Sequence, residues 1–234
     1  LVTEGYTYDM SCFVAWGDKL ASEGPAAFYS ADYFADYPPG YILVLGLVSL
    51  VRKALQLSYE SRWTYFLLAL IPAICDCAAV VLLDHISRRY MGQGRAQRCL
   101  VLFAAFCPLT LFDTGIWQQI DGAFALPLLL CFWLLEERRY LLAAVLYGVA
   151  LAIKPQALLA GPVLAVCFLV AIADAVRDGK SPLKSVGQIF GGAALALLPP
   201  LLAGLPFYGA KNLVPSLIDK YITTASGYQY ATIN

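Results

Sequence analysis

The residues best suited to chemistry in this chain of 234 residues are a few carboxylates and one lysine among apolar and aromatic neighbours. Asp9 precedes Phe13 by four positions and Trp16 by seven, a spacing that places all three on one face of a helix. A carboxylate beside aromatic faces suits a sugar ring, which stacks through its C–H groups and needs acceptors for its hydroxyls. An amphipathic helix at the membrane interface, with Trp16 among the headgroups and Asp9 in the first turn, explains the same pattern.

A second carboxylate, Asp36, begins the sequence Asp36-Tyr37-Pro38-Pro39-Gly40-Tyr41. The two prolines fix the backbone where the chain enters an apolar segment, so Asp36 is expected to be held rigidly at the membrane surface. The alternative is a plain transition from loop to helix, with proline in the first helical turn.

A polar stretch from Asp113 to Gly122 interrupts the apolar block from Cys99 to Leu135, and we expect it to be a turn between two helices. It contains the sequence Trp117-Gln118-Gln119-Ile120-Asp121. Ionisable groups close to a bilayer are candidates for function. A polar hairpin that faces water is the alternative.

Lys154 is the only charged residue between Tyr140 and Ala173, and Pro155 and Gln156 follow it. A buried ammonium needs a partner, and an anionic phosphate at the membrane surface would supply one. Snorkelling to the interface or a salt bridge to Asp113 or Asp121 would also satisfy it.

The composition requires these residues to be positioned by membrane helices. The chain is 60% hydrophobic and 14% charged, against roughly 25% charged in soluble proteins. With 16 basic and 16 acidic residues it has no basic field for nucleic acid. The single histidine, His85, and the absence of paired CxxC motifs predict neither a histidine-based metal site nor a Ser-His-Asp triad.

Apolar blocks of about 20 residues, divided at the polar stretches and at Lys154-Pro155, predict an all-α polytopic membrane protein. About six transmembrane helices are expected, at residues 63–83, 99–113, 121–135, 140–153, 156–173 and 186–207. Asp76, inside the first of them, is interpreted as a polar packing contact between helices.

Because successive membrane helices run in opposite directions, the basic residues at 88–98, 138–139 and 177–184 would lie on one side of the membrane. We assign that side to the cytoplasm. Residues 1–62 then form an outer N-terminal loop with amphipathic or re-entrant helices, 63–207 the helix bundle, and 208–234 the start of a later outer loop. The short apolar run in 38–51 is taken not to span, although this places Arg52, Lys53 and Arg62 outside. An interfacial helix would let Arg52 and Lys53 reach headgroup phosphates.

The order of these motifs resembles that of the polytopic GT-C glycosyltransferases. The likeness is greatest to bacterial proteins related to the second mannosyltransferase of GPI-anchor synthesis, and weaker to the dolichol-pathway glucosyltransferases. The resemblance implies an inverting enzyme of the bacterial plasma membrane with an outward-facing active site. Its donor would be a polyprenyl-phosphate-linked hexose, with mannose the sugar that the likeness implies, and its acceptor would be a hydroxyl of a glycan, lipid or protein.

The first-loop acid of that family matches Asp9, which the resemblance therefore makes the general base. Substrate binding is assigned to Trp16, Asp36, Tyr37, Trp117, Gln118, Gln119, Asp121, Lys154 and Gln156. Lys154, with Arg52 or Lys53, would stabilise the leaving phosphate. The sequence departs from the family pattern at Gln118, where a glycine is usual, and in lacking an Asp-x-Asp pair in the first loop. No metal ligand is therefore assigned, and the use of a divalent cation is left open.

The family's first span would precede Leu1 and its later spans would follow Asn234, so we expect the chain to be a fragment of a larger GT-C fold. A transporter or flippase of lipid-linked sugars, or an inactive assembly partner, remains the alternative function. The enzyme hypothesis requires residues 1–37 and the Trp117-Asp121 stretch to open onto one compartment.

Overall fold

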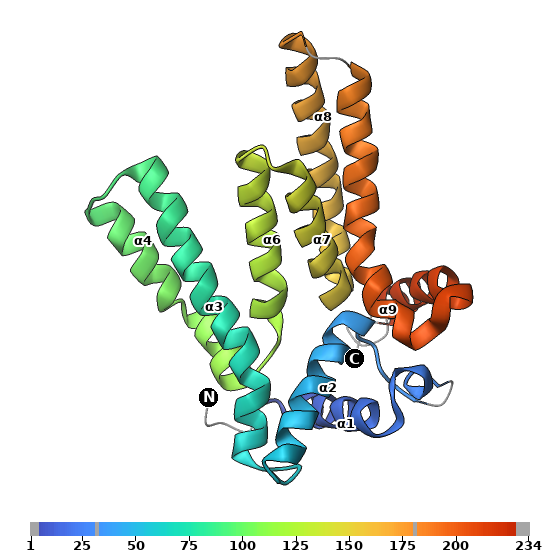
Figure 1. The fold of residues 1–234 in the computed structure, drawn as a ribbon. Helices are drawn as coiled ribbons and strands as arrows, with labels where there is room; N and C mark the ends of the chain where they lie inside the picture. The colour runs from blue at the N-terminus through green and yellow to red at the C-terminus, as the bar shows by residue number, and fades with distance from the viewer. Residues whose placement is uncertain (1–4, 31–32, 180–181, 228–234) are drawn as a thin grey trace. The chain divides into compact units, whose positions relative to one another are not determined.

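The computed structural model describes residues 5–30, 33–179 and 182–227, which form helices joined by short loops with no strand among them. The chain divides into two compact units, each described by itself (Figure 1). Unit 1 contains Leu1–Phe28 and Ile42–Leu129, and unit 2 contains Tyr29–Tyr41 and Leu130–Asn234. The predicted all-α class is confirmed.

Unit 1 begins with α1 (Thr7–Glu23) and a short 3-10 turn, η1 (Pro25–Ala27). It continues with α2 (Pro39–Ala54) from Ile42 onward, α3 (Arg62–Met91), α4 (Arg95–Ala105), the single turn α5 (Pro108–Thr110), the π-helical η2 (Leu111–Trp117) and the start of α6 (Asp121–Glu136). Ser61 caps α3 by accepting a hydrogen bond from the Trp63 N–H at 3.3 Å, and Gly92 ends it with φ 66°. Helices α3 and α4 pack side by side in opposite directions (Figure 1).

Helix α2 has 16 residues and is therefore about 24 Å long, which is short for a bilayer core of about 30 Å. It ends where Gln56 adopts a left-handed conformation with φ 54°. The N–H groups of Gln56 and Leu57 then bond to the carbonyls of Lys53 and Arg52, a Schellman-type ending. This length fits the prediction that the segment does not span.

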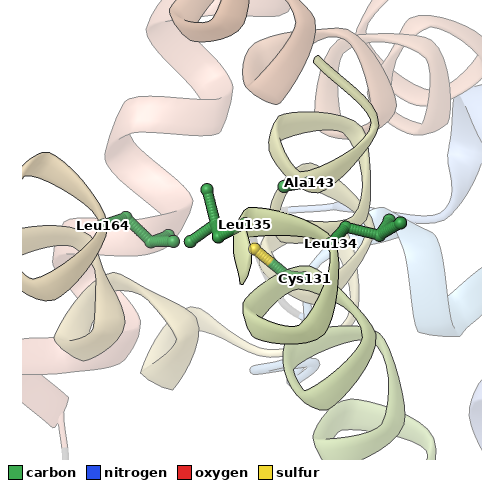
Figure 2. Close-up of a cluster of buried hydrophobic side chains, with 5 residues drawn as sticks. All are labelled: Cys131, Leu134, Leu135, Ala143 and Leu164. Atoms are coloured by element: carbon green, nitrogen blue, oxygen red, sulfur yellow. The ribbon is translucent and has the colours of Figure 1, made fainter. Parts of the chain in front are cut away.

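Unit 2 contains the end of α6 (Asp121–Glu136), α7 (Tyr140–Ile153), the 3-10 segment η3 (Pro155–Ala160), α8 (Gly161–Arg177) and α9 (Pro182–Gly227). Helix α7 packs along α9, and a Cβ on Gly148 would collide with the carbonyl oxygen of Ala196. Small residues at this contact let the two backbones approach closely. Figure 2 shows the neighbouring apolar cluster, in which Leu135 of α6 and Leu164 of α8 point toward each other.

The helices lie at all six predicted places, and the predicted break at Lys154 is confirmed. Among the described residues four segments are long and apolar enough to cross a membrane: Arg62–Met91, Arg95–Trp117, Pro155–Arg177 and Phe190–Ile222. Helix α7 is apolar but shorter. The chain is thus an integral membrane protein, whereas six crossings and the assignment of the sides stay predictions.

Two boundaries differ from the sequence-based expectation. The polar stretch after Asp113 was expected to be a turn, but the chain remains helical to Trp117 and breaks only at residues 118–120. Two hydrogen bonds stabilise this backbone: the Asp113 carbonyl accepts from the Gln119 N–H at 3.0 Å, and Thr114 Oγ1 donates to Asp76 of α3. After a break at Gly209, where φ is 63°, α9 continues to Gly227, so the described part of the expected outer loop at 208–234 is helical.

Candidate functional site

The N-terminal segment contacts the turn between η2 and α6 within unit 1. The Tyr6 N–H donates to the Trp117 carbonyl at 3.1 Å, and the two rings form an edge-to-face pair with centroids 6.0 Å apart. Gln119 Nε2 donates to Asp9 Oδ2 at 2.6 Å. The start of α1 thus lies beside this turn, whereas the opening of residues 1–37 and the turn onto one compartment stays a prediction. We call Asp9, Trp117 and Gln119 the Asp9 cluster, and Asp121 follows Gln119 by two positions at the first turn of α6.

The turn that carries this cluster has an unusual backbone. It follows a π-helical segment, a type of turn often found at functional sites, and Gln118 is left-handed with φ 61° and ψ 42°. This conformation costs a non-glycine residue about 1 kcal/mol, a cost that a glycine at this position would avoid. The Gln118 side chain is buried, and a Cβ on Gly5 would lie 2.9 Å from its Oε1. Gln118 thus packs where the N-terminal segment meets the turn.

Asp76 of α3 is hydrogen-bonded to η2, the segment that leads into the same turn. Its Oδ2 accepts a hydrogen bond from Thr114 Oγ1 at 2.5 Å. A Cβ on Gly122 would collide with Asp76 Oδ1 and lie 2.7 Å from the Pro72 carbonyl oxygen, so α6 begins directly against α3. The interpretation of Asp76 as a polar packing contact is confirmed, and Asp121 lies in the first turn of α6, directly before Gly122.

Helix α1 has the predicted stripe, with Asp9 half-buried and Phe13 and Trp16 buried. The Phe13 and Trp16 rings lie 5.8 Å apart at 57°, and Trp16 is only 3% exposed. Trp16 is therefore a packing group of α1 in this conformation, and its contact with a sugar stays a prediction. Trp117 is 44% exposed and is the aromatic residue of the Asp9 cluster that offers a face to a ligand.

Arg52 differs from the expectation that it reaches headgroup phosphates. Its Nη2 lies 2.7 Å from both carboxylate oxygens of Asp18, and its Nη1 donates to the Leu57 carbonyl at 2.7 Å. Ser49 Oγ also donates to Asp18. Burial opposes ionisation of Asp18, but hydrogen bonds from Arg52 and Ser49 outweigh it and lower the Asp18 pKa. The ion pair neutralises Arg52, one of the three basic residues at 52, 53 and 62 whose outward placement departs from the cytoplasmic preference of Lys and Arg.

In unit 2 the structure brings the Asp36-Tyr41 motif to Lys154. The Lys154 Nζ lies 6.0 Å from the centroid of the Tyr37 ring. A Cβ on Gly40 would collide with the carbonyl oxygen of Ala152, two residues before Lys154, so the start of α2 packs directly on the end of α7. Lys154 itself is extended, with φ −140° and ψ 136°, because Pro155 cannot continue the helix. Gln156 is exposed on η3.

Sequence reasoning missed Lys220 and Tyr29, which hold the same loop. Lys220 Nζ donates to the Ala35 carbonyl and lies 4.8 Å from the centroid of the Tyr29 ring. The Tyr29 hydroxyl donates to the Tyr37 carbonyl at 2.7 Å, and burial raises the Tyr29 pKa well above its usual value, so this donor stays protonated. We call Asp36, Tyr37, Lys154 and Lys220 the Lys154 cluster.

A sequence signal for Lys220 existed, since it is an ionisable residue between Asp219 and Tyr221 close to an apolar block. It was overlooked because residues 208–234 were assigned to a loop. Within the described residues, no group of three or more His, Cys, Asp or Glu side chains is placed to hold a metal ion.

Comparison with protein families shows that the model of glycosyltransferase family 87 matches residues 34–225. The matched region includes the turn at 117–121 and every residue of the Lys154 cluster, and it begins after α1. Neither the comparison with curated proteins nor that with solved structures finds a match.

Proposed function

Because the chain belongs to glycosyltransferase family 87, a family of membrane glycosyltransferases, we propose a specific transfer reaction for it. The donor is a polyprenyl-phosphate hexose, with mannose as the first sugar to test, and the acceptor is a hydroxyl group at the outer face of a bacterial plasma membrane. The anomeric configuration inverts, because a single displacement occurs at the sugar carbon. About six helices cross the membrane in this proposal, and they form part of a larger GT-C fold.

The observation that carries the proposal is the 2.6 Å hydrogen bond from Gln119 Nε2 to Asp9 Oδ2. A donor fixed on Oδ2 orients the carboxylate, and we assign Oδ1 to the acceptor proton. The acceptor oxygen attacks the anomeric carbon as its proton passes to Asp9. The bond from that carbon to the phosphate oxygen breaks, and polyprenyl phosphate leaves with the electron pair.

Sugar recognition is assigned to the polar and aromatic groups around Asp9. The exposed face of Trp117 suits stacking on a sugar ring, while Asp121 and Gln119 suit its hydroxyls. Gln118 and Trp16 are buried, and their contribution is to hold the turn and α1 in place.

Donor recognition is assigned to the Lys154 cluster with Gln156. The leaving phosphate gains negative charge during transfer, and the Lys154 ammonium stabilises it electrostatically. Tyr37, whose ring lies beside this ammonium, and Asp36 orient the donor. Arg52 has no part in phosphate binding in this proposal, because Asp18 and Leu57 occupy its guanidinium.

The test is donor turnover by the full-length protein in proteoliposomes, with radiolabelled polyprenyl-phosphate mannose and a membrane extract as the source of acceptors. Asp9→Asn should lower turnover by about 10²- to 10⁴-fold, the contribution of a general base. Glu23→Gln is the matched control, since Glu23 is an exposed carboxylate of the same helix paired only with Lys19 in the described contacts. Undiminished transfer by Asp9→Asn would remove Asp9 from the role of base.

The donor role of Lys154 is tested with the same assay. Lys154→Met should raise the KM for the donor, whereas Lys211→Met, at an exposed position, should not. An unchanged donor KM in Lys154→Met would refute the phosphate role. Release of sugar-free polyprenyl phosphate separates transfer from the alternative of a flippase, which moves the lipid-linked sugar without cleaving it.

A further inference from the structure

Lys220 is a half-buried cation in the segment of α9 that follows the break at Gly209. A charged group among apolar helices persists where it has partners, and Lys220 has several. Its Nζ donates to the Ala35 carbonyl and lies over the Tyr29 ring at 4.8 Å. The carboxylates of Asp36 and Asp219 both attract it electrostatically.

The loop that Lys220 holds is fixed at a second point on the other side of Asp36. The Tyr29 hydroxyl donates to the Tyr37 carbonyl at 2.7 Å, and Tyr29 is itself stacked on Tyr208 of α9 with centroids 5.3 Å apart. The carbonyls before and after Asp36 are thus both bound by side chains. Neither bond depends on the Asp36 side chain, so the backbone position of Asp36 is determined by Lys220 and Tyr29.

The position of this loop also sets the relation between Tyr37 and Lys154. Residues 35 and 37 are at most about 7 Å apart along the chain, so movement at Ala35 is transmitted to Tyr37. The Lys154 ammonium lies 6.0 Å from the Tyr37 ring. Loss of the bond from Lys220 to the Ala35 carbonyl would therefore move the Tyr37 ring, which lies beside Lys154, the proposed phosphate ligand.

We propose that Lys220 is a positioning residue of the transfer reaction, which holds the Ala35 carbonyl and its charge beside Asp36 so that the loop presents Asp36 and Tyr37 to the lipid-phosphate donor. This inference rests on the proposed function. Lys220 is not assigned as a phosphate ligand, because its ammonium already donates to the Ala35 carbonyl and lies over the Tyr29 ring. Lys154 remains the cation that meets the phosphate.

The kinetic test compares Lys220→Met, Lys220→Arg and Lys211→Met in the full-length protein. Lys211 is an exposed lysine of the same helix and provides the same chemical change away from the loop. Lys220→Met should raise the KM for polyprenyl-phosphate mannose about tenfold, the loss expected for one charge-assisted hydrogen bond, with a smaller change in kcat. Lys220→Arg should restore most of the affinity, because arginine retains a charged donor. If Lys220→Met only reduced the number of folded molecules, the apparent kcat would fall and the KM would stay unchanged. That result would overturn the proposal, and so would equal KM values in Lys220→Met and Lys211→Met.

A second measurement needs no donor. Ala35→Cys keeps the backbone carbonyl that Lys220 binds and places a thiol at a buried position. Maleimide labelling of this cysteine, read by mass spectrometry of its peptide, should be faster when Lys220→Met is added and unchanged with Lys211→Met. Equal rates would overturn the role of Lys220. If the wild-type protein turns over no donor, the proposed function fails, and the labelling rates still decide whether Lys220 holds the loop.

Discussion

Replacing Arg52 by methionine should destabilise the protein by about 3 kcal/mol. Methionine preserves much of the apolar stem, so the main loss is the hydrogen bonds to Asp18 and to the Leu57 carbonyl, each 2.7 Å long. Removing one member of a buried ion pair costs about 3–5 kcal/mol, because the remaining charge is left uncompensated. The Arg52 side chain is 11% exposed and that of Asp18 is 28% exposed, so water partly compensates and the lower end of this range applies.

The assay is thermal unfolding of the purified full-length protein in detergent, followed by tryptophan fluorescence. For a chain of this size each kcal/mol corresponds to about 2–4 °C, which predicts a Tm lower by about 6–12 °C. Lys53→Met, at the neighbouring exposed position, is the control and should leave the Tm nearly unchanged. In a double-mutant cycle with Asp18→Asn, the combined loss should be smaller than the sum of the single losses.

The pH dependence of folding stability is a second test of the ion pair between Arg52 and Asp18. The folded state lowers the Asp18 pKa from its ordinary 3.8, so the ion pair contributes stability above pH 3.8 and loses it as pH falls through the lower folded-state pKa. Arg52→Met should therefore make stability less sensitive to acid. The reasoning is refuted if Arg52→Met and Lys53→Met shift the Tm equally, if the cycle is additive, or if the loss appears only with anionic lipids.

Three further changes probe the two clusters. Gly40→Val should destabilise by about 1–3 kcal/mol, because its side chain would meet the backbone of α7 and force the helices apart, and a lower Tm is the measure. Gln119→Ala should lower kcat about 10- to 100-fold, since it removes the 2.6 Å charge-assisted bond to Asp9, and donor turnover is the measure. Thr114→Val should leave Asp76 without the 2.5 Å bond that supports the turn and cost about 1–3 kcal/mol, again seen in the Tm.

Each of these has an outcome that would contradict it. Gly187→Val is the control for Gly40→Val, because nothing lies within 4 Å of a Cβ at Gly187, and equal Tm values would show that the close approach is not limiting. Gln119→Ala with normal turnover would show that Asp9 needs no orienting donor. Thr114→Val with an unchanged Tm would remove Asp76 from the support of the turn.

Part of the site could be predicted because its signals are local. The spacing of Asp9, Phe13 and Trp16 indicated a helix with one common face, and α1 has it. The pairing of Asp9 with Gln119 was foreseen only as a shared compartment, since the two residues are 110 positions apart and no local rule selects a partner at that distance. Lys220 was missed for the same reason, because it bonds to a carbonyl 185 positions away.

The sequence by itself determined where the helices lie, apart from their ends at Trp117 and Gly227, and that they belong in a membrane. Proline removes a backbone donor at Lys154-Pro155 whatever surrounds it, and long apolar segments avoid water in any fold. Only the tertiary structure decided what each polar side chain does. It turned Arg52 from an expected lipid contact into the partner of Asp18, because a charge withdrawn from water binds the acceptors that packing brings within reach.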